Sequence, residues 1–134
     1  MVSRWVVDAM NVVGCRPDGW WRDRTGAVAG LVEEIVHWRE LTGEPVLVVV
    51  DGFGSERLDS GTHLGVHVLF VETAAPDAAD DRIAALVGRH PEPSTLRVVT
   101  SDGDLADRAR AAGATVEGAA AFRRRLQDAA GSRS

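Results

Sequence analysis

A chain of 134 residues, 45% of them hydrophobic and 26% charged, fits one globular domain with a single core and excludes a disordered polymer. The net charge of −5 disfavours a basic nucleic-acid coat protein, and because all 15 basic residues are arginine, a P-loop lysine and a lysine Schiff base are excluded. The single cysteine, Cys15, excludes an internal disulfide framework and a cysteine-rich zinc site.

Short β-branched runs alternate with segments of helical periodicity along the whole chain. The predicted strands cover residues 4–8, 46–51, 66–71, 97–101 and 114–117. The predicted helices cover about residues 23–42, 77–89, 102–112 and 119–130. This alternation predicts a single α/β domain over residues 1–130 with a mainly parallel sheet, followed by a frayed tail over 131–134.

Two stretches between these elements read as loops, residues 11–22 and residues 52–65, because glycine, proline and serine interrupt them. The first loop contains the pair Trp20-Trp21. We interpret this pair as a lid that folds onto the core, with a stacking platform for nucleic-acid bases, or a contact between copies of the chain, as alternatives. No apolar run has the roughly 20 residues of a membrane span, and no signal peptide is recognised, so we expect a cytoplasmic protein.

Three of the predicted strands run directly into an aspartate, at Asp8, Asp51 and Asp102. The carboxyl ends of parallel strands meet at one edge of the sheet, where open α/β folds keep their sites. A further pair, Asp80-Asp81, opens a predicted helix. Carboxylates packed this closely repel one another, and a hard divalent cation relieves that repulsion. The sequence therefore predicts an acidic, metal-binding site at the edge of the sheet.

Helix capping is the competing explanation for the same acids. Asp77 has the position of an N-cap with Asp80 three residues later, and Asp102 or Asp104 could cap the helix that follows them. Capping explains one acid at each helix start but leaves the others unexplained. Both interpretations stay open at this point.

Three ordered motifs resemble the NYN branch of the PIN-like nucleases. Residues 7–11 (Val-Asp-Ala-Met-Asn) resemble its Asp-Gly-Tyr-Asn opening, with Ala9 and Met10 departing from it. Residues 79–83 (Ala-Asp-Asp-Arg-Ile) and 99–105 (Val-Thr-Ser-Asp-Gly-Asp-Leu) resemble its helix start and its Thr-Ser-Asp-x-Asp-Leu turn. The resemblance covers about residues 4–127 and implies a PIN-like (Rossmann-like) domain whose five-stranded parallel sheet has the order 3-2-1-4-5 and helices on both faces.

That order makes strands 1 and 4 neighbours at a topological switch point, which would bring Asp8 and Asp102 side by side. We assign Asp8, Asp80 and Asp102 as the catalytic metal ligands, with Asp51 and Asp104 as further ligands. Because Asp81 would point about 100° away from Asp80 around the helix, we expect it to be solvated or paired with an arginine.

The cofactor we expect is Mg²⁺ or Mn²⁺, because the candidate ligands are carboxylates and no His/Cys set suits zinc. Asn11 and Ser101 would orient Asp8, a water or a phosphate. The candidate contacts to a phosphate backbone are arginines, namely Arg16, Arg22, Arg24, Arg57 and Arg82.

The function we expect is metal-dependent hydrolysis of RNA, with homo-oligomers possible and no membrane partner. The alternative is an RNA-binding or regulatory module that keeps the fold without catalysis, favoured by the acidic net charge and by Ala9-Met10. A receiver-like phosphoacceptor is disfavoured because the chain has no lysine, and a phosphatase with a DxD nucleophile because Met10 stands where the second aspartate would be.

Overall fold

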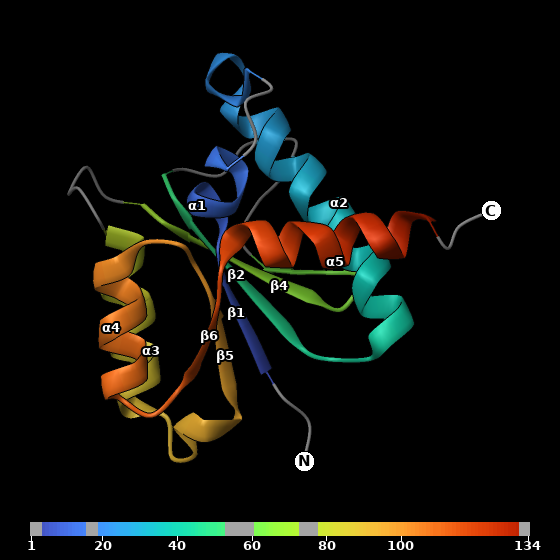
Figure 1. The fold of residues 1–134 in the computed structure, drawn as a ribbon. Helices are drawn as coiled ribbons and strands as arrows, with labels where there is room; N and C mark the ends of the chain where they lie inside the picture. The colour runs from blue at the N-terminus through green and yellow to red at the C-terminus, as the bar shows by residue number, and fades with distance from the viewer. Residues whose placement is uncertain (1–3, 16–18, 53–60, 73–77, 132–134) are drawn as a thin grey trace.

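The computed structural model describes residues 4–15, 19–52, 61–72 and 78–131. Within these ranges a six-stranded sheet of order β3-β4-β2-β1-β5-β6 carries helices on both faces (Figure 1). Its strands are β1 (Arg4–Asp8), β2 (Val46–Asp51), β3 (Gly61–His63), β4 (Val66–Val71), β5 (Leu96–Val99) and β6 (Thr115–Glu117). Neighbouring strands are parallel except β3, which pairs antiparallel with β4.

The described ranges also contain five α-helices and two short 3₁₀ turns. They are α1 (Ala9–Gly14), α2 (Arg24–Thr42), α3 (Ala78–Arg89), α4 (Gly103–Ala111), α5 (Ala119–Gly131), η1 (Trp20–Arg22) and η2 (Pro93–Thr95). The helix α2 begins where the Asp23 side chain accepts a hydrogen bond from the Gly26 amide, and it ends at Gly43, whose φ of 73° suits glycine. No helix within the described ranges is both long enough and apolar enough to cross a membrane.

The expected sheet order is confirmed. The five predicted strands correspond to β1, β2, β4, β5 and β6, whose order β4-β2-β1-β5-β6 is 3-2-1-4-5 in chain order, with β1 central. The sheet has one strand more than expected, because residues 61–63 of the predicted loop 52–65 form β3. This strand is short and lacks an apolar pattern. It forms through backbone pairing across a turn in which Leu64 (φ 49°) and Gly65 (φ 89°) are both left-handed.

The prediction of a loop over residues 11–22 is wrong at both ends. The helix α1 begins immediately after Asp8, and η1 occupies Trp20–Arg22. Two valines and a glycine have weak helix propensity, but Val12 and Val13 are both buried. Burial of this short apolar segment against α2 and α5 therefore outweighs its local preference.

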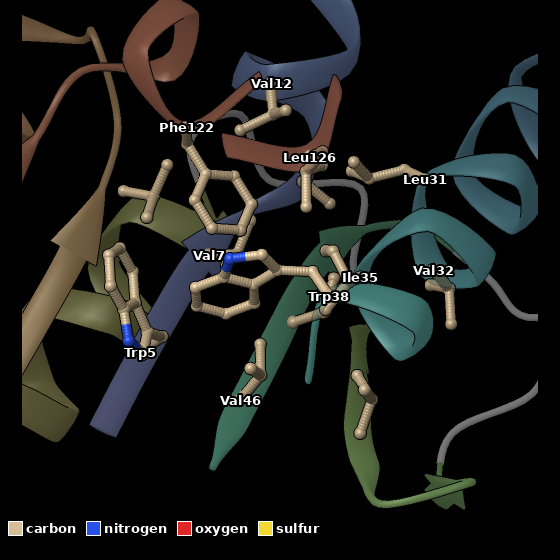
Figure 2. Close-up of a cluster of buried hydrophobic side chains, with 14 of the residues drawn as sticks. Trp5, Val7, Val12, Leu31, Val32, Ile35, Trp38, Val46, Phe122 and Leu126 are labelled. Atoms are coloured by element: carbon tan, nitrogen blue, oxygen red, sulfur yellow. The ribbon is translucent and has the colours of Figure 1, made fainter. Parts of the chain in front are cut away.

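The larger core lies between the sheet and the helices α1, α2 and α5 (Figure 2). Its centre is aromatic: the Trp5 ring is 5.0 Å from the Trp38 ring and 5.6 Å from the Phe122 ring, centroid to centroid. Aromatic contacts at such spacings add stability beyond the area they bury. Three elements far apart in sequence thus meet at one cluster, which fixes α2 and α5 against β1.

The second core covers the opposite face of the sheet and includes α3 and α4. Along β1, Trp5 and Val7 point to the first core whereas Val6 points to the second. This alternation is expected of a strand buried on both faces. The last residue of the strand, Asp8, is then carried to the sheet edge in a buried position.

Candidate functional site

The carboxyl ends of β1 and β5 form the switch point of the sheet. From β1 the chain crosses to β2 through α2 on one face, whereas β5 is entered through α3 and left through α4 on the other face. The two strands are direct parallel neighbours, with Val7 opposite Val99. Asp8 ends β1, and Thr100 to Asp102 follow β5. A crevice at this point is where open α/β sheets bind ligands.

Asp8 is a buried carboxylate with a perturbed pKa. Its side chain belongs to a residue that is 5% exposed, and burial raises its pKa from 3.8 to about 6. The Thr100 hydroxyl and the Asn11 backbone N–H lower the pKa, whereas the nearby charges of Asp51 and Asp102 raise it. The structure therefore brings Asp51 and Asp102 close enough to Asp8 for mutual repulsion.

Thr100 links Asp8 to Asp102, a role that the sequence reasoning missed. Its hydroxyl donates to Asp8 Oδ2 at 3.1 Å, and its Oγ1 accepts from the Asp102 backbone N–H, also at 3.1 Å. The residue is buried. A buried hydroxyl must satisfy its hydrogen bonds, so Thr100 fixes the spacing between the two strand ends. Its place directly before Ser101-Asp102 was the available signal.

Asp51 reaches across to the start of α3. Its Oδ1 accepts from the Ala79 backbone N–H at 2.8 Å. Asp80 is the next residue, half-buried in the first turn of that helix. The N-terminus of a helix favours negative charge, so this end of α3 stabilises the carboxylate of Asp51. Asp77, the expected cap, lies outside the described residues.

Asp102 caps α4, as the competing explanation expected. Its Oδ1 accepts from the Leu105 backbone N–H at 3.2 Å. The same carboxylate also acts on the pKa of Asp8, so capping and membership of the acidic edge are compatible. Asp104, two residues further, is exposed. Asp81 points away and binds Arg108 at 3.0 Å, which confirms the expected arginine pairing.

Asn11 and Ser101 hold backbone segments together at this edge. Asn11 Oδ1 accepts from the Ser101 backbone N–H at 2.7 Å, and Ser101 Oγ accepts from the Ala119 backbone N–H at 2.8 Å. The first bond ties α1 to the turn after β5, and the second caps α5. Both side chains thus position the segments that carry the aspartates.

Three of the candidate arginines lie in the described part of the chain. Arg22 and Arg24 are exposed near the start of α2, and Arg82 is exposed on α3. Arg16 and Arg57 lie outside the described residues. Because α2 and α3 cover opposite faces of the sheet, exposed cations are present on both sides of it and are candidates for contacts to a phosphate backbone.

The two tryptophans of η1 differ. Trp20 is half-buried and packs against the larger core, as the lid interpretation expects. Trp21 is 57% exposed, and the Arg22 guanidinium lies 5.9 Å from its ring centroid. The interpretation as a lid therefore fits Trp20, whereas Trp21 presents its ring to solvent.

The donor chemistry fits a hard cation that keeps much of its water. Among the described residues, no three Asp, Glu, His or Cys side chains are grouped so that they could hold an ion. Asp8, Asp51 and Asp102 nevertheless supply only oxygen, and each has one oxygen bound to a protein donor. Mg²⁺ is commonly held by one or two carboxylates with waters and phosphate oxygens completing its shell, whereas an all-protein cage is not built here.

The fold is similar to that of solved structures. Over 96% of its length the chain superposes on crystal structures of Rae1 (YacP) from Bacillus subtilis. For a single-substitution mutant the TM-score is 0.76 at 23% identity, covering 77% of that chain, and for the second structure it is 0.72 at 24% identity, covering 75%.

No curated protein matches the chain significantly in sequence. The family model of the YacP-like NYN domain matches residues 5–133. This match covers nearly the whole domain, and the fold agrees with it, because the central strand β1 ends in a buried aspartate. The chain therefore belongs to the YacP-like NYN family of nuclease-like, RNA-related domains.

Proposed function

We propose that the protein is a Mg²⁺- or Mn²⁺-dependent endoribonuclease whose site is the acidic edge between β1 and β5. The observation that carries this proposal is the burial of Asp8 beside Asp51 and Asp102, which raises its pKa to about 6. A protein gains nothing in stability from such an arrangement, and strongly perturbed carboxylates in a crevice are typical of functional sites.

Asp8, Asp80 and Asp102 are the proposed catalytic metal ligands, with Asp51 and Asp104 as additional ones. When bound, a divalent cation would supply polarisation of the phosphodiester and an activated water. The protein's part is positional: Thr100 holds Asp8 in place, and the bond from Ala79 holds Asp51. The proposed contacts to the RNA backbone are arginines, namely Arg22, Arg24, Arg82, Arg16 and Arg57.

The test is a cleavage assay of the purified protein on single-stranded RNAs and DNAs with Mg²⁺, Mn²⁺ or EDTA. We expect RNA cleavage with either metal and none in EDTA. Asp8→Asn and Asp102→Asn should remove cleavage. Asp107→Asn, which changes an exposed carboxylate on α4, the helix that Asp102 caps, is the matched control and should cleave as the wild type does.

Metal binding can be measured without a substrate. A metal that binds only the folded state stabilises it by about 2.7 kcal/mol at a hundredfold excess over Kd. Melting curves of the wild type should therefore shift upward with Mn²⁺, and those of Asp8→Asn and Asp102→Asn should shift less. An equal shift in all three proteins would contradict the assignment of these ligands.

A non-catalytic RNA-binding module is the second candidate. It is favoured by one observation, that no three potential ligands are grouped around one point among the described residues. In that case the protein would bind single-stranded RNA in the presence of metal and leave it intact. The same cleavage panel, run beside a gel-shift measurement, separates the two functions.

A further inference from the structure

A second concave site lies beside the acidic edge, between α1, η1, α2 and α5. It is a cavity of about 250 Å³, and none of its lining residues is one of the proposed metal ligands. Trp20 forms one wall, Glu34 and Arg123 form another, and Gly26 and Gly30 leave the α2 side open. An aromatic wall with a few convergent polar groups is the usual make-up of a small-ligand pocket.

The polar wall is an ion pair between helices. Arg123 Nη1 lies 2.9 Å from Glu34 Oε2, and Arg123 is 8% exposed whereas the Glu34 side chain is 35% exposed. The Nε atom of Arg123 is buried and has no hydrogen-bond partner among the described residues. A buried ion pair is not needed for stability, because apolar residues of similar size often serve as well. The two charges also balance, so the pocket suits a ligand without net charge at that end.

The apolar part of the pocket suits a flat ring. Trp20 offers its indole on one side, and α2 offers two positions without side chains on the other. A Cβ built at Gly30 meets nothing within 4 Å, so the space beside that residue is empty. Single-stranded RNA is read by stacking unpaired bases on aromatic rings and by hydrogen bonds to their edges.

We propose that this pocket binds a guanine base of single-stranded RNA, an inference that rests on the proposed function. Guanine is the one common base whose Watson–Crick edge carries two adjacent donors, N1–H and the N2 amino group. A carboxylate accepts both, which assigns that edge to Glu34. The guanidinium of Arg123 carries five N–H donors, and guanine O6, beside N1–H, is the acceptor for one of them. Adenine, cytosine and uracil each place an acceptor where one of these donors is required.

Two elements, α5 and α1, lead from the acidic edge to the pocket. The helix α5 starts where the Ala119 amide bonds Ser101, the residue before Asp102. Arg123 is four residues further, about 6 Å along the helix at 1.5 Å per residue. Val13, also in the pocket lining, is five residues after Asp8. A base in the pocket would thus belong to a nucleotide close to the phosphodiester at the acidic edge and would set the position of cleavage.

The first experiment measures binding of GMP, IMP and AMP to the full chain in EDTA, by titration followed through protein NMR shifts. IMP differs from GMP only by the missing N2 amino group. Loss of one hydrogen bond to a charged acceptor should weaken IMP on the order of tenfold relative to GMP, and AMP should bind more weakly still. Equal affinities for the three nucleotides, or no saturable binding of GMP, would overturn the proposal.

Two pairs of variants connect the preference to the pocket. Glu34→Gln should abolish the preference for GMP over IMP, whereas Glu40→Gln, an exposed glutamate on the same helix, should keep it. Because Glu34→Gln also disturbs Arg123, Gly30→Leu is the second variant. It fills the pocket from α2 at a position where leucine favours helix formation. Gly30→Leu should remove GMP binding, and Gly88→Leu, at an exposed and open position of α3, should not.

Single-guanine oligoribonucleotides separate RNA from a free nucleotide as the ligand. An RNA with one guanine should bind more tightly in EDTA than the same RNA with inosine, and with metal it should be cleaved at a fixed distance from that guanine. A preference shown by GMP but by no oligonucleotide would overturn the assignment to RNA. Cleavage without guanine preference contradicts this pocket alone, whereas guanine-selective binding without cleavage contradicts the proposed function alone.

Discussion

The two ends of β1 contribute to the stability of the fold in opposite directions. At its amino end Trp5 is 2% exposed and packs against Trp38. Its indole Nε1 donates to Glu44 Oε2 at 2.6 Å, and the guanidinium carbons of Arg97 and Arg125 lie 4.8 Å and 5.2 Å from its ring centroid. Each of these contacts lowers the free energy of the folded state.

At the carboxyl end, three residues further, Asp8 is almost as deeply buried. Its neighbours there include two more carboxylates, Asp51 and Asp102. Burial is the main cause of its raised pKa, and the charges of these two neighbours add a smaller rise. Burial without compensation costs free energy when the group is charged. The same strand therefore gains stability at one end and loses some at the other, and the loss falls where a cation would relieve it.

The largest effect should come from breaking the stable end. Trp5→Ala removes a buried aromatic side chain, so we expect the free energy of unfolding to fall by about 3–5 kcal/mol, a large part of the roughly 5–15 kcal/mol of a typical domain. Denaturant unfolding curves measure this change. Trp21→Ala, at an exposed ring, should stay within about 0.5 kcal/mol of wild type. Equal losses would show that the cluster around Trp5 is not the anchor of the fold.

The acidic end should respond in the opposite direction. Because the folded-state pKa of Asp8 lies near 6, above its ordinary value of 3.8, the folded protein binds this proton more tightly than the unfolded chain does. The stabilisation by the proton is complete below pH 4 and is lost as the pH rises through 6. Asp8→Asn keeps an uncharged group at every pH, so in metal-free protein it should be more stable than wild type above pH 6.

The rise in pKa sets a ceiling of about 3 kcal/mol on this gain. Thermal unfolding in EDTA across pH 4 to pH 8 checks it: the difference between Asp8→Asn and wild type should grow between about pH 4 and pH 6 and then level off. Asp107→Asn on α4 is the control and should show no such step. A difference that does not vary with pH would contradict the raised pKa of Asp8.

A smaller effect should separate the two roles of Asp102. Asp102→Ala removes the cap of α4 and should cost about 0.5–2 kcal/mol. Asp102→Asn keeps a cap of equal quality and also removes one charge that repels Asp8, so its stability in EDTA should match or exceed that of wild type. Chemical denaturation of both variants decides the point, and a loss in Asp102→Asn as large as in Asp102→Ala would contradict it.

The smallest effect should come from the acid that points away from the edge. The bond between Asp81 and Arg108 joins two exposed side chains, and exposed pairs contribute about 0–1 kcal/mol. Arg108→Ala should therefore lower the midpoint of unfolding slightly at low salt and hardly at all at high salt. Denaturation at two ionic strengths measures this, and a loss that persists at high salt would mean that Arg108 has a packing role as well.

The sheet could be predicted because its evidence is local. Valine-rich runs such as 46–50 have the composition of strands buried on both faces, and the resemblance of the ordered motifs supplied the order of the strands. The helix α1 could not be predicted in the same way. Val12 and Val13 favour a helix only because α2 and α5 cover them, and this cover depends on residues far along the chain.

The candidate site also has a part that the sequence predicted and a part that only the structure shows. The aspartates at strand ends were visible as a pattern, and the approach of Asp102 to Asp8 follows from the sheet order. The motif marks the position of Thr100 before Ser101-Asp102, but only the structure shows that its hydroxyl bonds Asp8. The pairing of Glu34 with Arg123 likewise joins α2 to α5, whose relative placement the sequence does not state.

Three hydrogen bonds at the acidic edge and its neighbouring pocket each span most of the chain. The bonded pairs Asp8–Thr100, Asn11–Ser101 and Glu34–Arg123 are separated by 92, 90 and 89 residues. Contacts of such range form late, after long stretches of chain have been closed into loops. During synthesis, the first 99 residues carry Asp8 and Asn11 but lack Thr100 and Ser101, which bond them. The acidic edge is therefore complete only after the growing chain has passed residue 102, and the pocket only after Arg123 has been added.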